Sequence, residues 1–392
     1  MKREEIIELD NEYIMNTYGR LELVPEKGTG SLIYDKNGKK YIDFTSGIGV
    51  NIFGWNDEGW KNAVIEQINK FQHVSNYFYN EKASLTAELI CKKSGMCNMF
   101  FANSGAEANE GAIKLARKYS YDKYGEGRAT IVTLNKSFHG RTVTTLAATG
   151  QDVFHNYFFP FTGGFKYVEA GDIAMLEKTC TSDVCAVMLE VVQGEGGVNI
   201  LREDYVKNVR KLCDERDILM IVDEVQTGIG RCGKLFGYMN YEIKPDIVTS
   251  AKGLGGGIPI GAFISGEKCS KTLGAGMHGS TFGANPVSTA AAYYILSKLD
   301  DEFLDEVNKK GEYIRNKISE INSPHIREIR GVGMMIGIET DLPPKDVLHK
   351  AFDSGLLVLT AGSNVIRLLP PLNITYDEID SGINILGEVL SE

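Results

Sequence analysis

No stretch of this 392-residue sequence approaches the roughly 18 consecutive apolar residues that a membrane-spanning helix needs. The first residues, MKREEIIELDNEY, are charged and contain no apolar core like that of a secretory signal peptide. Basic residues are in deficit, with 42 against 52 acidic ones and a formal net charge of −10. Nucleic-acid-binding proteins usually present a basic face. We therefore expect a cytoplasmic protein with neither membrane nor nucleic acid among its partners.

Cysteine and histidine are scarce and poorly placed for disulfides or metal sites. The seven cysteines are scattered, and none form a C-x-x-C pair. An odd set of scattered thiols indicates a reducing compartment rather than a disulfide framework. The six histidines include no H-x-x-x-H or H-E-x-x-H spacing, so the sequence predicts no metal centre.

Nucleotide-binding motifs also find little support. The sequence contains no G-x-x-x-x-G-K-[ST], and its glycine-rich stretches GLGGGIPIG and GVGMMIG both miss the G-x-G-x-x-G spacing. A nucleotide-dependent α/β enzyme is therefore a disfavoured alternative. A binding or structural protein without catalysis is a further alternative, to be judged on the residues below.

Short apolar strands alternate with helical segments through the middle of the chain. Continuous apolar strands that alternate with helices indicate a mostly parallel sheet covered by helices on both faces, which is an α/β fold. The expected strands and their polar ends are NMFFANSG, ATIVTLNKSFHG, VCAVMLEVVQGEGG, ILMIVDEVQTG and DIVTSAKGLGG.

The two ends of the chain depart from this alternation. LIYDKNGKKYIDF predicts a hairpin that turns at Asn37-Gly38. Beyond residue 300, a helix over 302–321, four short strands and a last helix near 376–390 predict a smaller α+β domain. We expect three parts: an N-terminal segment (1–56) that packs with the small domain, a large domain (57–300) and the small domain (301–392).

Each central strand is apolar until its end and then turns polar, as in NSGAEA, SFHGRT, QGEGG, DEVQTG and SAKG. In an open α/β sheet the ligand crevice lies at this edge. Asp223 and Lys252 stand 29 residues apart, close to the length of one strand-crossover-strand unit. We therefore expect them on neighbouring strand ends.

Asp223 and Lys252 each have a simple structural explanation. A buried aspartate needs a partner, so Asp223 could be a helix cap or half of an ion pair, and Lys252 could extend its amine to the sheet edge. A desolvated lysine, however, has a lowered pKa and is a nucleophile for carbonyls. The small residues around Lys252 leave room for a ligand.

Ser104, Gly105 and Ala106 stand at the start of a predicted helix. Free N–H groups and the helix dipole make such a position suitable for a phosphate. An ordinary N-cap by Ser104 or Asn103 explains the same residues equally well.

Other candidates come from polar stretches with less distinctive patterns. Phe138 could stack on a flat ring or be ordinary core, and Arg141 could bind a carboxylate or face water. His139 is interpreted as a hydrogen-bonded structural histidine rather than a base. Arg367 could face solvent from a half-exposed strand, and Glu195 could be a turn residue.

Together, these residue types match what pyridoxal phosphate requires of a protein. The requirements are a phosphate cradle, a lysine for the aldehyde, an aspartate for the ring nitrogen, an aromatic to stack on the ring and arginines for substrate carboxylates. Asp223 would keep the pyridine nitrogen protonated, and Lys252 would bind the aldehyde. Intact Lys252 and Asp223 argue against a protein that has lost catalysis.

The chain resembles the class III (ω-amino) transaminases from about Tyr34 to Leu372. The resemblance implies the type I fold of pyridoxal-phosphate-dependent transferases and a homodimer with shared active sites. The motifs that carry it, in the order of that family, are FANSGAEANEGAIKLAR, FHGRT, EVVQGEGG, DEVQTGIGR, SAKGLGGGIPIGA, HGSTFGANP and RLLPPL.

The resemblance also implies a role for each matching residue. Lys252 would hold the cofactor and later move the proton between the substrate Cα and the cofactor C4′. Asp223 would bind the pyridine nitrogen. The substrate-binding residues implied are Arg141 with Ser280 for a carboxylate, and Glu195 with Arg367 as a switch between two substrates. The further cofactor-binding residues are Gln226 at the 3′-oxygen, Val225 and Phe138 on the ring faces, Ser104, Gly105 and Ala106 at the phosphate, and Thr281 from the partner subunit.

The expected reaction moves the δ-amino group of N2-acetyl-L-ornithine to 2-oxoglutarate. Ornithine and succinyl-diaminopimelate are the alternative donors. Gly47 stands where ornithine-using members carry a tyrosine, which favours an acylated amine. Three departures from the commonest pattern, at Trp55, Val191 and Ala284, remove no catalytic group.

Overall fold

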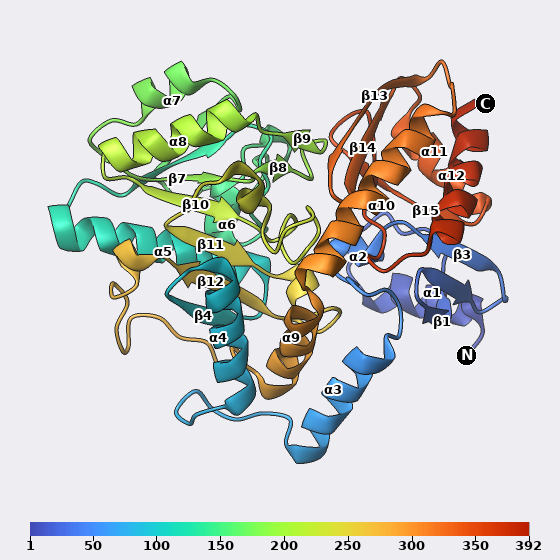
Figure 1. The fold of residues 1–392 in the computed structure, drawn as a ribbon, viewed down its shortest axis with the longest axis horizontal. Coiled ribbons are helices and arrows are strands. Elements are labelled where there is room, and N and C mark those ends of the chain that lie inside the picture. The colour runs from blue at the N-terminus through green and yellow to red at the C-terminus, as the bar shows by residue number, and fades with distance from the viewer. Residues whose placement is uncertain (392) are drawn as a thin grey trace.

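The computed structural model describes residues 1–391 (Figure 1). Its centre is a seven-stranded sheet in which only β12 runs against the other strands. The mostly parallel sheet predicted from the alternating pattern is therefore confirmed. In spatial order the strands are β4 (Asn98–Ala102), β12 (Gly261–Ser265), β11 (Ile247–Ser250), β10 (Leu219–Asp223), β7 (Val184–Leu189), β5 (Thr130–Leu134) and β6 (Phe165–Val168).

The central strands are buried on both faces, which explains their continuous apolar sequences. In β10, Leu219 and Ile221 join the core cluster that contains residues of helix α5 (Gly105–Tyr124). Met220 and Val222 point the other way and join the cluster that contains residues of helix α8 (Glu203–Glu215). The sheet accordingly lies between these helices (Figure 1).

Further helices surround the sheet and connect its strands. None of the helices in residues 1–391 combines the length and apolarity that crossing a membrane requires. The remaining helices of this region are α3 (Glu58–Lys70), α4 (Glu81–Ser94), α6 (Val143–Ala148), α7 (Ile173–Thr179) and α9 (Pro286–Lys298).

Elements from the two ends of the chain lie side by side, blue beside red in Figure 1. The β15 strand (Leu356–Leu357) pairs in parallel with β3 (Lys40–Asp43), which joins the C-terminal part to the N-terminal hairpin. One four-stranded sheet has the order β1-β2-β3-β15, with β1 (Pro25–Thr29) and β2 (Leu32–Asp35). The other has the order β13-β14-β17-β16, with β13 (Ile326–Val332), β14 (Met335–Thr340), β16 (Leu359–Ala361) and β17 (Val365–Leu368). A separate ribbon pairs β8 (Val192–Gln193) with β9 (Asn199–Ile200).

Several sequence predictions for these ends are confirmed. β2 and β3 form the expected antiparallel hairpin, and Gly38 takes the left-handed φ of +82° that its tight turn requires. The predicted helix over 302–321 is α10 (Asp301–Ser319), and the last helix is α12 (Tyr376–Ser391). The other helices of the two ends are α1 (Arg3–Tyr13), α2 (Ser46–Gly49) and α11 (Pro344–Asp353).

A further glycine-rich stretch, in addition to the two that miss the dinucleotide-binding spacing, does match it. GIGRCG, residues 228–233, does fit the G-x-G-x-x-G spacing. It forms turns instead of starting a helix, and the next helical segment is the short η2 (Gly237–Tyr241). Arg231 within it is buried and donates to the carbonyls of Met334 and Pro370. The stretch therefore ties the central sheet region to the C-terminal part and does not build a dinucleotide-binding turn.

Candidate active site

A cavity of about 610 Å³ lies at the carboxyl ends of the central strands. It is the crevice expected for an α/β sheet. Polar groups from five separate segments meet there, as the strand-end pattern predicted. The sequence-predicted residues that line the cavity are Ser104, Gly105, Ala106, Phe138, Arg141, Glu195, Asp223, Val225, Gln226 and Lys252.

Lys252 begins η3 (Lys252–Leu254), directly beyond the end of β11. Its φ of +46° is unusual for a residue with a side chain, and such strain is typical of functional sites. Within residues 1–391 its Nζ has neither a hydrogen bond nor an ion pair. Burial lowers the pKa of the amine, and the carboxylate of Glu195 partly opposes that effect. Lys252 is therefore a free amine that deprotonates more easily than an ordinary lysine.

Asp223 ends β10 and is almost fully buried. One carboxylate oxygen, Oδ2, accepts from Asn109 Nδ2 at 2.8 Å and lies 2.8 Å from His139 Nδ1. The other, Oδ1, accepts from the main-chain N–H of Val225 at 3.0 Å. A carboxylate only accepts, so His139 donates from Nδ1. These three donors fix the orientation of the Asp223 carboxyl group at the cavity wall.

Helix α5 begins at the cavity, with Ser104 as its N-cap. Ser104 Oγ accepts from the N–H of Glu107 at 3.2 Å. A side chain at Gly105 would stand 2.7 Å from Val225 Cγ1, which explains the glycine at this position. Because the first N–H groups of a helix have no partner within it, the start of α5 presents donors and a positive dipole end to the cavity.

Glu195, Gln226 and Arg367 form one hydrogen-bonded group. Arg367 Nη1 donates to Glu195 Oε1 at 2.7 Å and to Gln226 Oε1 at 2.9 Å. Gln226 Nε2 donates to Glu195 Oε1 at 3.2 Å. Burial would raise the pKa of Glu195, but the Arg367 guanidinium outweighs it and the pKa is lowered. Glu195 is therefore ionised and neutralises the charge of Arg367.

Four candidate residues from the sequence do not line this cavity. Arg367 is connected to it only through Glu195 and Gln226, which do line it. Ser280 and Thr281 line a different cavity of about 730 Å³. Ser280 reaches the first cavity only indirectly, since its Oγ accepts from Asn103 Nδ2 at 3.1 Å. Gly47 is exposed on α2 with a φ of +61° and is not among the lining residues.

Among the polar side chains that line the cavity, three had not been singled out from the sequence: Glu190, Asn109 and Tyr18. Glu190 follows a buried strand just as Asp223 does, so the same signal could have found it. Burial, followed by the nearby Asp223 carboxylate, raises the pKa of Glu190 well above its usual value, while Glu190 accepts from the N–H of Phe138 at 2.9 Å. No local pattern marks Asn109 within a helix or Tyr18 in the N-terminal segment.

These features fit pyridoxal phosphate. Lys252 offers an unpaired amine inside the cavity and Asp223 offers an oriented carboxylate. The start of α5 offers main-chain N–H donors suited to a phosphate, with Gly105 packed closely against Val225. These groups are an amine for the aldehyde, a carboxylate for the ring nitrogen and N–H donors for the phosphate, which the cofactor requires. Within residues 1–391 no cluster of potential metal ligands is found.

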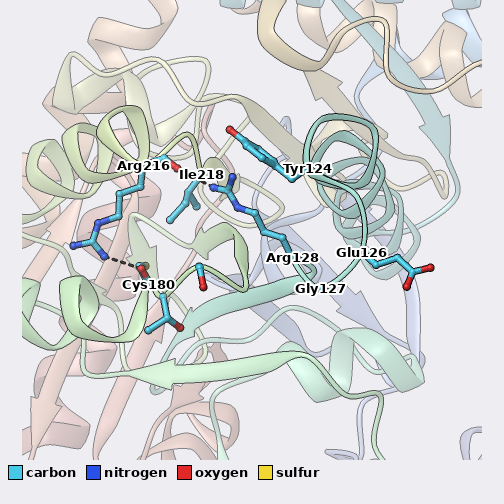
Figure 2. A pocket seen from close by; sticks show the side chains of 9 residues that line it. Tyr124, Glu126, Gly127, Arg128, Cys180, Arg216 and Ile218 are labelled. Atoms are coloured by element: carbon cyan, nitrogen blue, oxygen red, sulfur yellow. Dashed lines mark hydrogen bonds between the residues drawn. The ribbon is translucent and has the colours of Figure 1, made fainter.

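A cavity of about 690 Å³ at the opposite edge of the sheet has a different character (Figure 2). Arg128 donates to the carbonyls of Val184 and Asp217, and Arg216 donates to that of Cys180. Burial raises the pKa of the Cys180 thiol to about 11, so the thiol stays protonated. The arginines therefore hold main-chain segments in place, and this cavity lacks the convergent reactive groups of the first.

Comparisons with known proteins agree with this geometry. The sequence profile of the family described as aminotransferase class-III matches residues 13–390. An acetylornithine aminotransferase of Haemophilus ducreyi is 52% identical over 395 residues, covering 100% of both chains. The structure of an N-acetylornithine aminotransferase from Stenotrophomonas maltophilia K279a matches with a TM-score of 0.85 and 36% identity over 98% of each chain. That of the ornithine aminotransferase from Toxoplasma gondii ME49 matches with a TM-score of 0.95 and 31% identity, covering 100% of this chain and 95% of that one.

The family, the fold and the cofactor expected from the sequence motifs are thus confirmed. This chain belongs to the class-III aminotransferases, and it is an enzyme that uses pyridoxal phosphate to transfer amino groups.

Proposed function

We propose that this enzyme transfers the δ-amino group of N2-acetyl-L-ornithine to 2-oxoglutarate. The products are N-acetyl-L-glutamate 5-semialdehyde and L-glutamate, in arginine biosynthesis in the cytoplasm. The observation that carries the proposal is that one of two arginines at the site has an ionic partner and the other has none in the part of the chain that the structure describes. Arg141 lines the cavity without an ionic partner in residues 1–391, whereas Arg367 is neutralised by Glu195. The acetylornithine aminotransferase names of similar proteins support the choice of donor.

Arg141 binds the carboxylate at the far end of the donor. A guanidinium without an ionic partner offers two parallel N–H groups to a carboxylate. The donor reacts through its distant amino group, so apolar methylenes must lie between that group and Arg141. A charged arginine beside them would be unfavourable, because a buried cation without a partner is costly. Glu195 removes this cost by pairing with Arg367 at 2.7 Å.

The second substrate needs the opposite arrangement. 2-Oxoglutarate carries a carboxylate directly beside its reacting carbon, and Arg367 is the cation to bind it. Glu195 must then leave Arg367, and its greater exposure allows the movement: its side chain is 29% exposed, against 3% for Arg367. One cavity can thereby serve two different substrates.

Bound pyridoxal phosphate supplies an aldehyde that links to amines and a ring that accepts the electron pair released when a C–H bond breaks. Lys252 would hold the aldehyde of the cofactor, and its amine would serve as base and acid at the substrate carbon. Asp223 keeps the ring nitrogen protonated through an ion pair. His139 and Asn109 orient that carboxylate through their 2.8 Å hydrogen bonds.

The remaining cavity residues hold the cofactor in place. The start of α5 binds the phosphate through Ser104, Gly105 and Ala106. Phe138 and Val225 both line the cavity and would cover the two faces of the ring. Gln226 binds the 3′-oxygen through its amide.

We further propose a homodimer with shared active sites. Thr281 would bind the phosphate in the partner subunit's site, and Ser280 would assist Arg141 there. Both residues lie apart from the cavity of their own chain, which supports a role in the neighbouring one. Large aromatic residues beside them are highly exposed, including Tyr77 at 96% and Phe282 at 62%, and would be covered by a second copy. The division into parts 1–56, 57–300 and 301–392 remains a prediction.

The proposed reaction is tested by determining which amino donor the enzyme prefers. Gly47 does not itself line the cavity, but it stands three positions before Val50, which does. A glycine here would leave space for an acylated amine and offers no hydroxyl to a charged one. Acetylornithine should exceed free ornithine in kcat/KM by at least about 10-fold, or roughly 1.4 kcal/mol. The measurement compares acetylornithine, ornithine and succinyl-diaminopimelate with 2-oxoglutarate, in wild type and in Gly47→Tyr.

Gly47→Ala is the matched control, because any side chain at this left-handed position is strained. The tyrosine, but not the alanine, should move the ratio towards ornithine. If ornithine or succinyl-diaminopimelate wins in wild type, that compound is the donor. If both variants leave the ratio unchanged, Gly47 does not determine specificity.

A further inference from the structure

Arg141 is held by aromatic rings and by no acidic residue. Its guanidinium carbon lies 4.0 Å from the ring centre of Phe154 and 5.6 Å from that of Phe138. The two rings are 5.9 Å apart and nearly perpendicular, at 74°. Within residues 1–391 Arg141 makes no ion pair or side-chain hydrogen bond, although its side chain is exposed.

The segment that carries Phe154 is itself fixed to the cavity wall. Phe154 ends the short η1 (Asp152–Phe154), and its N–H donates to the carbonyl of Gln151 at 3.0 Å. Gln151 Nε2 donates to the carbonyl of Ser137 at 3.0 Å. The main-chain N–H of Gly150 donates to Ser137 Oγ, also at 3.0 Å. Since Ser137 directly precedes Phe138, both rings stand on one connected piece of structure.

An aromatic ring suits an arginine that must bind a carboxylate. An acidic partner would occupy the N–H edge of the guanidinium and cancel its charge. A ring contacts the flat face by a cation–π interaction and leaves the edge free for a bidentate carboxylate. It also restricts a side chain that would otherwise lose considerable rotamer freedom on binding.

We infer that Phe154 is a positioning residue that holds Arg141 ready for the substrate carboxylate. Phe154 does not line the cavity itself, so it acts through Arg141 alone. The inference rests on the proposed function, in which Arg141 binds the far carboxylate of the donor. It adds a residue outside the cavity that determines how well carboxylate substrates are selected.

The test measures binding to the holoenzyme by isothermal titration calorimetry. The probe is N-acetyl-L-norvaline, which has the carboxylate end of acetylornithine but no transferable amine. Its neutral amide serves as the reference ligand. Phe154→Leu and Phe154→Met should weaken binding of the acid about fivefold relative to the amide, as expected for a lost cation–π contact, which equals ~1 kcal/mol. Phe154→Tyr should keep the wild-type ratio, because the ring is retained.

Phe161→Leu is the matched control, since Phe161 packs on His155 and not on Arg141. An unchanged acid-to-amide ratio in both Leu and Met variants of Phe154 would overturn the inference, as would an equal loss in Phe161→Leu. Arg141→Gln separates the two proposals. If it abolishes the preference for the acid and the Phe154 variants do not reduce it, only the role of Phe154 fails. If Arg141→Gln leaves the preference intact, the proposed role of Arg141 fails as well.

Discussion

Arg367 and Glu195 lie 172 positions apart in the chain, yet Arg367 Nη1 lies 2.7 Å from Glu195 Oε1. Glu195 lines the cavity, and Arg367 does not. The arginine comes from β17 and is buried, whereas the glutamate lies in the turn between β8 and β9. The pair is therefore asymmetric. In the proposed function, the more exposed Glu195 is the member that moves and Arg367 is the member that stays.

Glu195→Gln should separate the two half-reactions. The amide no longer neutralises Arg367, so the half-reaction with acetylornithine should slow by at least about 10-fold, given the cost of an unpaired buried cation. The half-reaction with 2-oxoglutarate should change by less than about threefold, because Arg367 remains available. Single-turnover measurements of each half-reaction check this. Equal slowing of both would show that Glu195 has no switching role.

Lys252→Ala should bind pyridoxal phosphate without a covalent link and lose turnover by several orders of magnitude. In the proposed function, one amine serves both as the attachment point and as the proton carrier. Borohydride treatment followed by peptide mass spectrometry should fix the cofactor on the residue 252 peptide in wild type and not in the variant. A variant that kept about a tenth of wild-type turnover would contradict the assignment.

Asp223→Asn should retain the fold and lose most activity. A neutral amide cannot hold the ring nitrogen protonated, and it faces the Asn109 and His139 donors with weaker acceptors. Asp223→Glu should also be poor, because the longer side chain displaces the ring. Thermal unfolding gives the control for folding, and steady-state kinetics gives the result. A near-normal kcat in Asp223→Asn would exclude this role.

Attachment of the cofactor to the apoenzyme should depend on pH through Lys252. Only the unprotonated amine attacks an aldehyde, so the rate rises with pH through the pKa of Lys252. Burial lowers that pKa from the ordinary 10.5, so the midpoint should lie below this value. Glu195 raises the pKa of Lys252 by its charge; hence Glu195→Gln should move the midpoint further down. A midpoint at the ordinary value, or a shift upward in the variant, would contradict the proposed environment of the amine.

Mixed dimers test whether active sites are shared. One chain carries Lys252→Ala and the other carries Thr281→Val. If Thr281 serves the partner subunit's site, each mixed dimer has one site with both defects and one with neither. Activity should then approach about half of the wild-type value per mixed dimer, as the symmetry of a two-fold dimer requires. Absence of recovery would mean that each chain completes its own site.

The sequence by itself determined the sheet and the chemistry at its edge. Apolar strands with polar ends placed Asp223 and Lys252 on neighbouring strands, because parallel strands end at one edge of a sheet. The structure has these strands as the adjacent β10 and β11. Such patterns are local, since each strand carries its own apolar run and its own polar end. The motifs around them were specific enough to identify the family and the cofactor.

Only the tertiary structure decided which distant side chains meet. Asn109 contacts Asp223 from the buried face of α5, and Arg367 contacts Glu195 from β17 of another sheet. Phe154 contacts Arg141 from η1, beyond α6. Ser280 and Thr281 stand apart from the cavity despite their motif. Such meetings depend on how sheets, helices and connecting turns pack against one another. Periodicity along the chain specifies the face of each element, but not the partner that the face will contact.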